Sequence, residues 1–434
     1  MFKEIGRKLN FIILSLTVTA ILFGNEAYYY KINSELKIDS GDTAWMIVSC
    51  ALVLLMTPGL AFFYGGMVNI KSIISTMFQS FVALGVVSVV WVFIGFSLAF
   101  GESFYGIIGN PFTYLNFKDV TLNPNKDFGP TIPFLLFALF QLKFAIITPA
   151  IISGSFAERI RFRSYILFMF LFTIFIYSPL AHMTWHPDGL FRSWGVLDFA
   201  GGTVVHMSAG LAALTGAIFL GKRKKIIEKP ANIPFVILGT GMLWFGWFGF
   251  NAGSALGANF DAVVAFANTS LASATSMITW IFYDRFTNKK MSSVGACIGA
   301  IVGLVAITPA AGFVTLGQSI FIGFIAAIVS NIAVKLNNKS KVDDTLDVFA
   351  THGIGGIVGM ILTAVFAKNV GLIYGEFTTF MFHLLTIIIT TVFTLLMSYI
   401  LFKIVNFLLP LRVREDQEER GLDASQHGEI YIIK

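Results

Sequence analysis

The feature that most constrains this chain is a series of long, continuous apolar runs, each about the length needed to cross a bilayer. Eleven such runs follow residue 43. They cover approximately residues 44–67, 73–99, 131–155, 164–184, 201–221, 233–255, 261–284, 291–308, 316–335, 347–367 and 377–408. Lipid offers no hydrogen-bond partners, so spanning segments must be helices or a closed barrel. The runs do not alternate apolar with polar residues, which excludes a barrel. The sequence therefore predicts an all-α polytopic membrane protein with eleven transmembrane helices.

The composition agrees with a bilayer location and excludes other classes. Apolar residues make up 56% of the chain and charged residues only 12%, which is more apolar surface than a soluble fold needs. The net charge of +6 does not indicate nucleic-acid binding, because the basic residues cluster in short loops between the runs. Cys50 and Cys297 lie inside apolar runs and are expected to be packing residues.

A metal site is not expected from the sequence. His182 and His186 are four residues apart, but Met183 stands where a zinc-protease motif would need Glu. Pro187 is expected to end the helix, so both histidines are predicted to border an outer loop. We predict no metal and no cofactor.

The N-terminal segment differs from the later runs. Lys3, Arg7 and Lys8 precede an apolar stretch at residues 11–23, which is short for a span and typical of a secretory signal. A cleavable signal peptide is therefore predicted over residues 1–27, with a retained anchor as the alternative.

Positive charge falls in every second connection between the runs. These connections carry Arg159, Arg161 and Arg163; Lys222, Arg223, Lys224 and Lys225; Arg285, Lys289 and Lys290; and Lys335, Lys339 and Lys341. Cytoplasmic loops of membrane proteins are enriched in Lys and Arg. The mature N-terminus is therefore predicted outside the plasma (inner) membrane, the transmembrane domain at residues 43–410, and a cytoplasmic tail at residues 411–434.

Two histidines lie deep inside apolar runs, each on a helix face of small residues. The neighbours at helical spacing are Gly202, Ala209, Gly210 and Ala213 around His206, and Gly356 and Gly359 around His352. Small residues mark where membrane helices approach closely, so both imidazoles are predicted to point into the bundle. A titratable group there is a candidate for an ion or proton pathway; a purely structural hydrogen bond is the alternative.

The two histidines occupy matching places in two halves of the chain. His206 is in the fifth run and His352 in the tenth, and the letters Ile-Thr-Pro-Ala recur at residues 147–150 and 307–310. Both recurrences are five runs apart. Because five is odd, the halves would cross the membrane in opposite senses, which predicts a five-plus-five inverted repeat with its site near the midplane. The eleventh helix is then an addition at the C-terminal end.

Several longer strings resemble the ammonium transporter family (Amt/Mep/Rh), on its bacterial Amt branch. They are Asp198-Phe-Ala-Gly-Gly-Thr-Val-Val-His206, Trp247-Phe-Gly-Phe-Asn-Ala-Gly-Ser254, Asp343-Asp-Thr-Leu-Asp-Val-Phe-Ala-Thr-His-Gly353, residues 154–161 and residues 419–429. The resemblance covers about residues 43–430, in order.

The resemblance implies a homotrimer whose subunits each have a pore for ammonium or ammonia, with methylammonium as a further candidate substrate. It also implies an outer ammonium site of Trp185, Phe144 and Ser254. Below that site it implies a gate formed by Phe144 and Phe250, and then the two pore histidines. The tail is similar to the family's regulatory tail, which implies a PII signalling protein as a partner at the cytoplasmic face.

The residues themselves are compatible with that implication. Trp247, Phe250 and Ser254 share one helix face, and Phe140 and Phe144 share another. Aromatic faces attract small cations, and a hydroxyl beside them offers ammonium a directional acceptor. In a chain with 46 Phe, lipid-facing packing is the alternative for such a pair.

Supporting roles are expected for a few polar residues. Asp198, Asp344 and Asp347 each precede a histidine-bearing helix and are expected to cap its N-terminus. Thr308 belongs to the repeated tetrapeptide. Lys143 lies mid-way along its run and is expected to point away from the pore, because a cation there would repel ammonium.

The predicted mechanism is transport and not enzymatic catalysis. Ammonium would lose its water at the outer site and its proton near the gate, and ammonia would pass the histidines. The alternatives are an electroneutral ammonia gas channel of the Rh type and an ammonium sensor of the same fold. A histidine-metal hydrolase would lack a third ligand. His383, alone in the last run, and His427 in the tail are not expected to form a site.

Overall fold

The computed structural model describes Lys8, Ser15 and residues 36–226 and 229–432 of the 434 residues. The predicted signal peptide at residues 1–27 lies outside the described residues except at Lys8 and Ser15.

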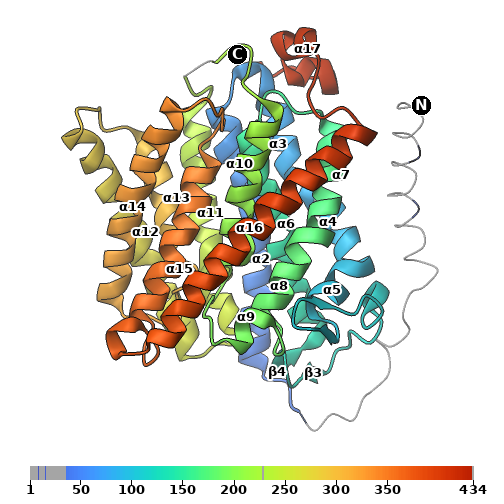
Figure 1. Ribbon diagram of the computed structural model, residues 1–434, viewed down its shortest axis with the longest axis vertical. Helices are drawn as coiled ribbons and strands as arrows, with labels where there is room; N and C mark the ends of the chain where they lie inside the picture. Colours follow the sequence, from blue (N-terminus) through green and yellow to red (C-terminus); the bar gives the residue numbers. More distant parts are fainter. Residues whose placement is uncertain (1–7, 9–14, 16–35, 227–228, 433–434) are drawn as a thin grey trace.

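The described chain is a bundle of helices whose axes are roughly parallel (Figure 1). In chain order the α-helices are α2 (Ser40–Met67), α3 (Ile73–Phe81), α4 (Ala83–Val90), α5 (Phe96–Phe100), α6 (Phe134–Ile152), α7 (Phe162–Phe172), α8 (Ser178–Trp185), α9 (Leu190–Ser193), α10 (Ser208–Leu220), α11 (Ile233–Ala252), α12 (Phe260–Phe286), α13 (Ser293–Ile307), α14 (Leu316–Lys339), α15 (Ile354–Phe366), α16 (Phe377–Leu408) and α17 (Glu415–Arg420). Five π-helical segments adjoin or interrupt them: η3 (Trp91–Gly95), η6 (Thr173–Tyr177), η7 (Gly202–Met207), η9 (Phe349–Gly353) and η11 (Asp423–His427). Two small antiparallel hairpins lie between α5 and α6, made of β1 (Ser103–Phe104) with β2 (Ile108–Gly109) and β3 (Pro124–Asn125) with β4 (Gly129–Pro133).

Ten helical segments of the described chain are long and apolar enough to cross a membrane. They occupy ten of the eleven predicted positions. The eleventh position, predicted at 291–308, holds α13, an apolar helix of 15 residues that is shorter than the others. The prediction of a helical, multi-pass membrane protein is confirmed.

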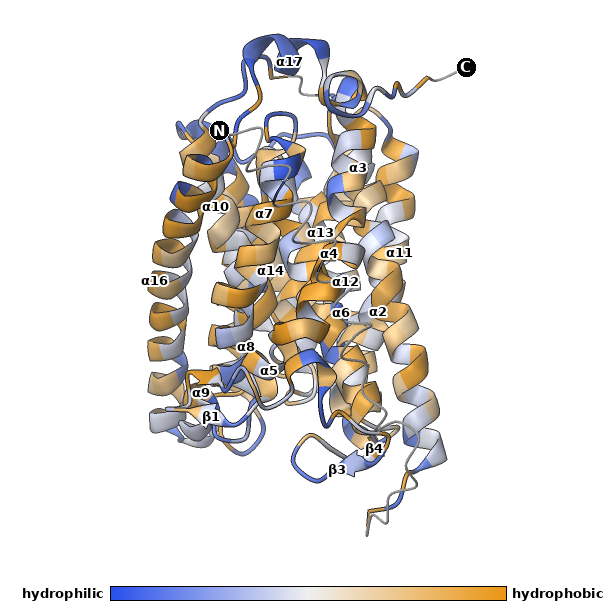
Figure 2. Ribbon diagram, turned by 90° about the vertical axis from the view of Figure 1, so that its right-hand side faces the viewer, coloured by the Kyte–Doolittle hydropathy of each residue, from blue (hydrophilic) through white to orange (hydrophobic). Residues whose placement is uncertain are grey.

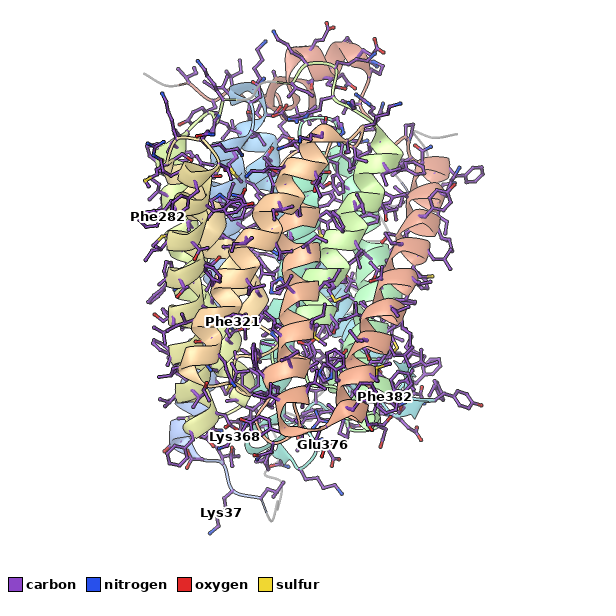
Figure 3. All side chains as sticks on the ribbon, turned by 60° about the vertical axis from the view of Figure 1, so that its left-hand side comes forward. Lys37, Phe282, Phe321, Lys368, Glu376 and Phe382 are labelled. Atoms are coloured by element: carbon purple, nitrogen blue, oxygen red, sulfur yellow. The ribbon has the colours of Figure 1, made fainter. Side chains whose placement is uncertain are left out.

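The outer surface of the bundle has the character expected of a lipid-facing wall. Apolar residues dominate the middle of the bundle, and hydrophilic residues gather at its two ends (Figure 2). Phe282 and Phe321 are 47% and 44% exposed and point outward from the bundle, whereas Lys37, Lys368 and Glu376 lie at one end (Figure 3). A soluble protein would pay a large free energy for such exposed apolar surface.

Four consecutive helices, α11 to α14, begin at a side-chain cap. Asn232, Asn259, Ser292 and Thr315 each accept a hydrogen bond from a backbone N–H in the first turn of the helix that follows. These caps satisfy donors that have no partner within the helix, so polar residues in the connecting loops set where these four helices begin.

The two histidine-bearing helices pack against each other through glycines, and the contact is reciprocal. A Cβ on Gly210 would overlap the backbone of Gly353, while a Cβ on Gly356 would come within 3.0 Å of the Gly202 carbonyl oxygen. Gly210 and Gly356 each lie four residues after their histidine, His206 or His352. The predicted small-residue faces therefore bring η7–α10 and η9–α15 into backbone contact.

We expect Gly210→Ala to destabilise the folded protein by about 1–3 kcal/mol, because the new methyl group overlaps backbone atoms that cannot move independently. Gly241→Ala is the matched control, since nothing lies within 4 Å of a Cβ at that position in α11. The control should be neutral or stabilising by up to about 1 kcal/mol, because alanine favours helix more than glycine does. Thermal unfolding midpoints in detergent measure both; equal midpoints for the two variants would contradict the close approach.

The basic connections and the C-terminal tail meet at one end of the bundle (Figure 1). The backbone N–H of Val413 donates to the Arg159 carbonyl at 3.0 Å, and that of Lys224 donates to Glu418 Oε1 at 2.6 Å. Asp423 accepts the N–H of Ser75 at 2.7 Å. The tail thus folds back against the end of the helical bundle.

Candidate functional site

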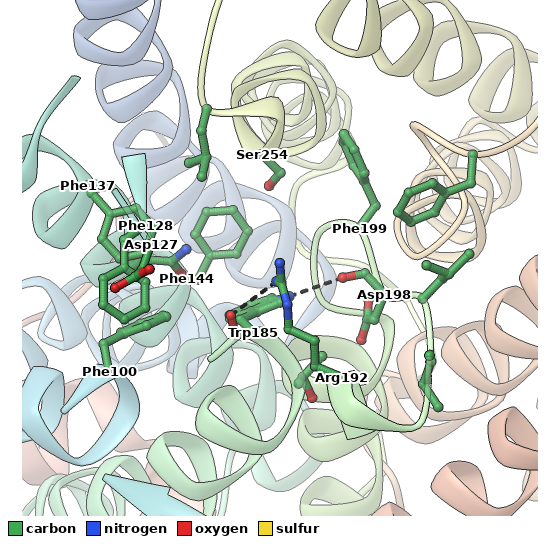
Figure 4. A pocket seen from close by; sticks show the side chains of 17 residues that line it. Phe100, Asp127, Phe128, Phe137, Phe144, Trp185, Arg192, Asp198, Phe199 and Ser254 are labelled. Carbon is green, nitrogen blue, oxygen red and sulfur yellow. Dashed lines mark hydrogen bonds between the residues drawn. The ribbon is translucent and has the colours of Figure 1, made fainter. Parts of the chain in front are cut away.

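A cavity of about 460 Å³ opens at the end of the bundle opposite the tail (Figures 1 and 4). Its lining includes all three residues expected at the outer ammonium site, together with Asp198. The residues are Phe100, Asp127, Phe128, Phe137, Gln141, Phe144, Thr184, Trp185, Arg192, Gly195, Val196, Leu197, Asp198, Phe199, Ser254, Leu256 and Phe313. Aromatic rings make up much of this wall.

Asp198 is held by the start of η7. Its Oδ1 accepts the backbone N–H groups of Gly201 at 2.8 Å and Gly202 at 2.6 Å, and its Oδ2 accepts the N–H of Thr203 at 2.8 Å and the Thr203 hydroxyl at 2.5 Å. Gly201 has φ +111°, a left-handed conformation that favours glycine. The carboxylate therefore occupies the positive end of the helix that carries His206.

Trp185 and Ser254 are each oriented by one hydrogen bond. Trp185 Nε1 donates to the Asp198 carbonyl oxygen at 3.1 Å, which leaves the ring beside Phe144 with centroids 5.8 Å apart. The Ser254 hydroxyl donates to the Phe250 carbonyl at 2.9 Å. Since that bond uses the hydroxyl proton, the oxygen can accept from a guest in the cavity.

Phe144 and Phe250 stand between this cavity and a second, smaller one. Their ring centroids are 4.2 Å apart. Phe144 lines the outer cavity, while Phe250 lines the inner one together with His206 and His352. The inner cavity measures only about 10 Å³ and its other walls are apolar. The two rings, stacked with their planes tilted by 32°, lie between the two cavities.

The histidine pair, His206 and His352, lies beyond the stacked rings. The two Nδ1 atoms are 3.2 Å apart, so one donates to the other. Both side chains are at most 4% exposed, and Nε2 of His206 has no hydrogen-bond partner among the described residues. Because either ring can supply the shared proton, two tautomer arrangements are available to the pair.

Trp247 packs against His206 and helps to hold it in place. Its ring stacks on His206 with centroids 5.4 Å apart and planes 17° apart. Trp247 Nε1 donates to the Thr308 hydroxyl at 3.0 Å, and that hydroxyl donates to the Leu304 carbonyl at 2.8 Å. Thr308 therefore helps to position His206 indirectly, by holding the Trp247 indole that packs against it.

The remaining predicted residues lie around this path. Phe140 contacts Phe144 edge-on, at 5.0 Å between centroids, but lines neither cavity. Lys143 is half-buried on α6 and lines neither cavity.

The prediction that His182 borders a loop is wrong. His182 lies inside α8 and is fully buried, whereas His186 is the residue that follows the helix end. Its Nδ1 is 2.9 Å from the Ala99 carbonyl and its Nε2 is 2.8 Å from the Ser103 hydroxyl. No cluster of metal-ligating side chains occurs in the described part of the chain.

A matched spacing of acid and histidine was missed in the sequence. Asp198 precedes His206 by eight residues, and Asp344 precedes His352 by eight residues. Asp344 Oδ2 accepts the N–H of Phe349 at 2.8 Å, at the start of η9. Each histidine therefore lies in a π-helix, a feature frequent at functional sites, with a capping carboxylate at its start. The equal spacing of eight residues between acid and histidine could have been read from the sequence.

The acids before η9 differ in how readily they hold a proton. Burial raises the pKa of Asp344, and burial together with the Asp344 carboxyl raises the pKa of Asp347 to about 7. For Asp343 burial also acts to raise the pKa, but hydrogen bonds from Arg223 outweigh it and hold the pKa below its usual value. Only Asp343 has a bonded cation, at 2.9 Å.

We expect Trp185→Leu to raise the ammonium concentration at half-maximal transport by roughly five- to thirtyfold, since a cation over a desolvated indole gains about 1–2 kcal/mol. Maximal transport should change less, because the stacked rings and the histidine pair are untouched. Ammonium titrations of current in proteoliposomes measure both quantities. Trp244→Leu, in α11 and outside both cavities, is the control; the same half-saturation in the two variants would place recruitment elsewhere.

Comparison with known proteins agrees with the resemblance seen in the sequence. The model of the Ammonium Transporter Family matches residues 44–431. An ammonium transporter of Aquifex aeolicus is 48% identical over 403 residues, covering 91% of this chain and 94% of that protein. The crystal structure of Candida albicans Mep2 has a TM-score of 0.82 at 34% identity and covers 88% of each chain. A structure described as Sensor Amt Protein has a TM-score of 0.83 at 29% identity, covering 89% of this chain and 98% of that one.

These matches span nearly the whole described chain and include the cavity, the stacked rings and both histidines. The chain belongs to the ammonium transporter family.

Proposed function

We propose that the chain carries ammonium across the membrane through the path between the two cavities, taking up the cation and passing it on as ammonia. The observation that carries this proposal is the order of groups along the path. A polar, aromatic cavity is followed by the stacked Phe144 and Phe250 rings and then by two buried imidazoles in apolar surroundings.

The outer cavity suits a small cation that is losing its water. The Trp185 and Phe144 rings offer π faces, and the Ser254 hydroxyl offers a directional acceptor. Asp198 adds negative charge to the lining of the same cavity, although its carboxylate oxygens already accept four hydrogen bonds. Asp198 therefore acts by shaping and charging the site, and direct contact with ammonium is not required.

Beyond the stacked rings the path favours a neutral species. Moving an unpaired ion into apolar surroundings costs far more free energy than moving a neutral molecule. Ammonium can shed a proton and continue as ammonia, whereas potassium cannot. The histidine pair can take part in proton movement, because either ring can hold the shared Nδ1 proton and pass it to the other.

The same residues do not favour the alternatives over transport. A sensor resembles the chain in fold at 29% identity, but the Aquifex aeolicus relative, named as a transporter, is closer at 48%. An electroneutral gas channel would need no cation site, while aromatic, hydroxyl and carboxylate groups all line the outer cavity.

We propose the following arrangement in the cell. The eleven helices, with α13 as the eighth, form a five-plus-five inverted repeat and an added α16, which the reciprocal glycine contacts support. Residues 1–27 are a cleaved signal peptide, residues 43–410 the transmembrane domain, and residues 411–434 a cytoplasmic tail. The protein is a homotrimer in the plasma (inner) membrane, with its N-terminus outside.

Currents from purified protein in proteoliposomes test the function. Steps of ammonium, methylammonium and potassium are applied to the same vesicles, alongside a nitrogen flux assay that detects uncharged transport. We expect nitrogen flux with ammonium, smaller flux with methylammonium, and no potassium current. Potassium current of the same size as ammonium current, or no nitrogen flux at all, would contradict the proposal.

A PII protein is the proposed partner at the tail end. A cavity of about 600 Å³ lies there, lined by Asn69, Ile70, Lys71, Ser72, Glu158, Lys224, Lys225, Glu418, Glu419 and Gly421. We expect truncation after Arg414 to lower PII retention in a pull-down at least fivefold, because it removes the Glu418 wall of the cavity. Lys225→Glu should also lower it, by reversing a charge in the basic connection. Equal retention by the parent and both variants would remove the tail and this connection from the interface.

A further inference from the structure

The backbone that presents Asp198 to the outer cavity has no regular secondary structure. Residues 196–201 lie between α9 and η7, and Val196, Leu197, Asp198 and Phe199 all line the cavity. A segment without its own hydrogen-bond ladder must be held by its neighbours. The position of Asp198, and of the Trp185 indole bonded to its carbonyl, therefore depends on those anchors.

One anchor comes from helix α16, which no sequence pattern connects with the site. The imidazole of His383 is fully buried, and its Nε2 accepts the backbone N–H of Leu197 at 3.0 Å. The two residues are 186 positions apart in the chain. A second contact of the same helix reinforces the first, because the Phe382 ring stacks on Trp194 at 5.4 Å between centroids. Figure 3 shows Phe382 at the end of the bundle that carries the outer cavity.

The other ring nitrogen fixes the tautomer. His383 Nδ1 lies 2.8 Å from the Thr379 carbonyl oxygen, which can only accept, so Nδ1 carries the proton and donates it. Nε2 then carries a lone pair that accepts the Leu197 N–H at 3.0 Å, and the Leu197 carbonyl oxygen, 3.3 Å from the same nitrogen, receives no proton from it. The imidazole is thus oriented by its own helix, and its acceptor nitrogen binds the backbone N–H of Leu197, the residue immediately before Asp198.

We propose that His383 is a positioning residue for the outer ammonium site, holding Leu197 so that Asp198 and the Trp185 indole keep their places in the cavity wall. This inference rests on the proposed function of that site. His383 touches no part of the path itself, since it lines neither cavity. Loss of its bond should therefore weaken ammonium recruitment while leaving the stacked rings and the histidine pair intact.

A pair of conservative variants separates positioning from packing. In His383→Gln, the side-chain oxygen reaches as far as Nε2 and can accept the Leu197 N–H. In His383→Asn, the side chain is shorter and can keep only the bond to Thr379. Thr394→Val is the matched control, because Thr394 is equally buried on α16 and its hydroxyl has no hydrogen-bond partner in the described part of the chain.

Ammonium titrations in proteoliposomes supply the first readout. We expect His383→Asn to raise the half-saturating ammonium concentration at least fivefold with maximal transport within a factor of two of the parent. His383→Gln and Thr394→Val should stay within twofold in both quantities. Equal half-saturation for the Asn variant and the parent would overturn the proposal. So would an equal loss in the Asn and Gln variants, because that would indicate packing alone.

Amide hydrogen exchange supplies a readout that does not depend on transport. Peptides covering residues 194–201 should exchange at least tenfold faster in His383→Asn than in the parent, and at the parent's rate in His383→Gln. If the parent protein carries no ammonium, the proposed function fails while this measurement still decides whether His383 holds the segment. Unchanged exchange in the Asn variant would overturn the anchoring itself.

Discussion

Replacing His206 or His352 with alanine is expected to lower ammonium transport at least tenfold. Each variant removes one half of the Nδ1–Nδ1 contact of 3.2 Å and leaves the other imidazole without that partner. A buried polar group without a partner costs about 1–3 kcal/mol, and the truncated side chain leaves a cavity that water can enter. The apolar path would then lose both its proton-sharing pair and its defined width.

The loss of ammonium transport in the alanine variants has to be distinguished from a loss of folded protein. Val204→Ala is a suitable control, because Val204 is fully buried in the same π-helix as His206 and lines neither cavity. We expect this control to lose stability but to keep transport within twofold per folded protein. Ammonium flux normalised to the folded fraction makes the comparison; flux in the alanine variants that matches the control would show that the pair is structural only.

Asp198→Asn is expected to have the second-largest effect. The carboxylate accepts three backbone N–H groups and one hydroxyl, and an amide can offer only one oxygen to these donors. Its NH₂ group would face N–H groups and its negative charge would be lost. Removing a hydrogen bond to a charged group costs about 1.5–3 kcal/mol, so the start of η7 should loosen and half-saturation for ammonium should rise at least tenfold.

The matched control for this variant is Asp39→Asn at the start of α2. Asp39 also caps a helix, but it accepts one side-chain hydrogen bond, from the N–H of Asp42, at an exposed site. Asparagine is an equally good cap at such a position, so stability and transport should stay within experimental error of the parent. Thermal unfolding and ammonium titration of both variants decide the point. If Asp198→Asn behaved like Asp39→Asn, the four hydrogen bonds would not be what shapes the site.

Much of the fold could be predicted from the sequence because a bilayer allows so few solutions. Long apolar runs had to be helices, and helices occupy every predicted position. The glycines spaced four residues after His206 and His352 correctly predicted close helix contact, since only glycine lets two backbones approach so far. Trp185, Phe144 and Ser254 line one cavity, although no sequence spacing could bring Trp185 and Ser254 together.

What the sequence could not predict depends on contacts between distant segments. Pro187 correctly marked the end of α8, but His182 lies one turn before that end and is buried by contacts with Ala99 and Ser103, which its spacing from the proline does not report. His383 was set aside as a lone histidine, and its bond to Leu197 exists only because α16 packs across the segment before η7. The π-helices that contain His206 and His352 depend on backbone hydrogen-bond register, which apolar periodicity does not report.

The most direct test of the central claim compares ammonium and potassium currents in the parent protein, His206→Asp and His352→Asp. An aspartate beside the remaining histidine adds an acceptor-only group to the apolar path, and a carboxylate can stabilise a cation that has not shed a proton. We predict no potassium current in the parent, and in both variants ammonium transport that is lost or altered, with measurable potassium current. If all three proteins carry the same ammonium current with the same exclusion of potassium, the histidine pair does not control the species that crosses, and the account is wrong.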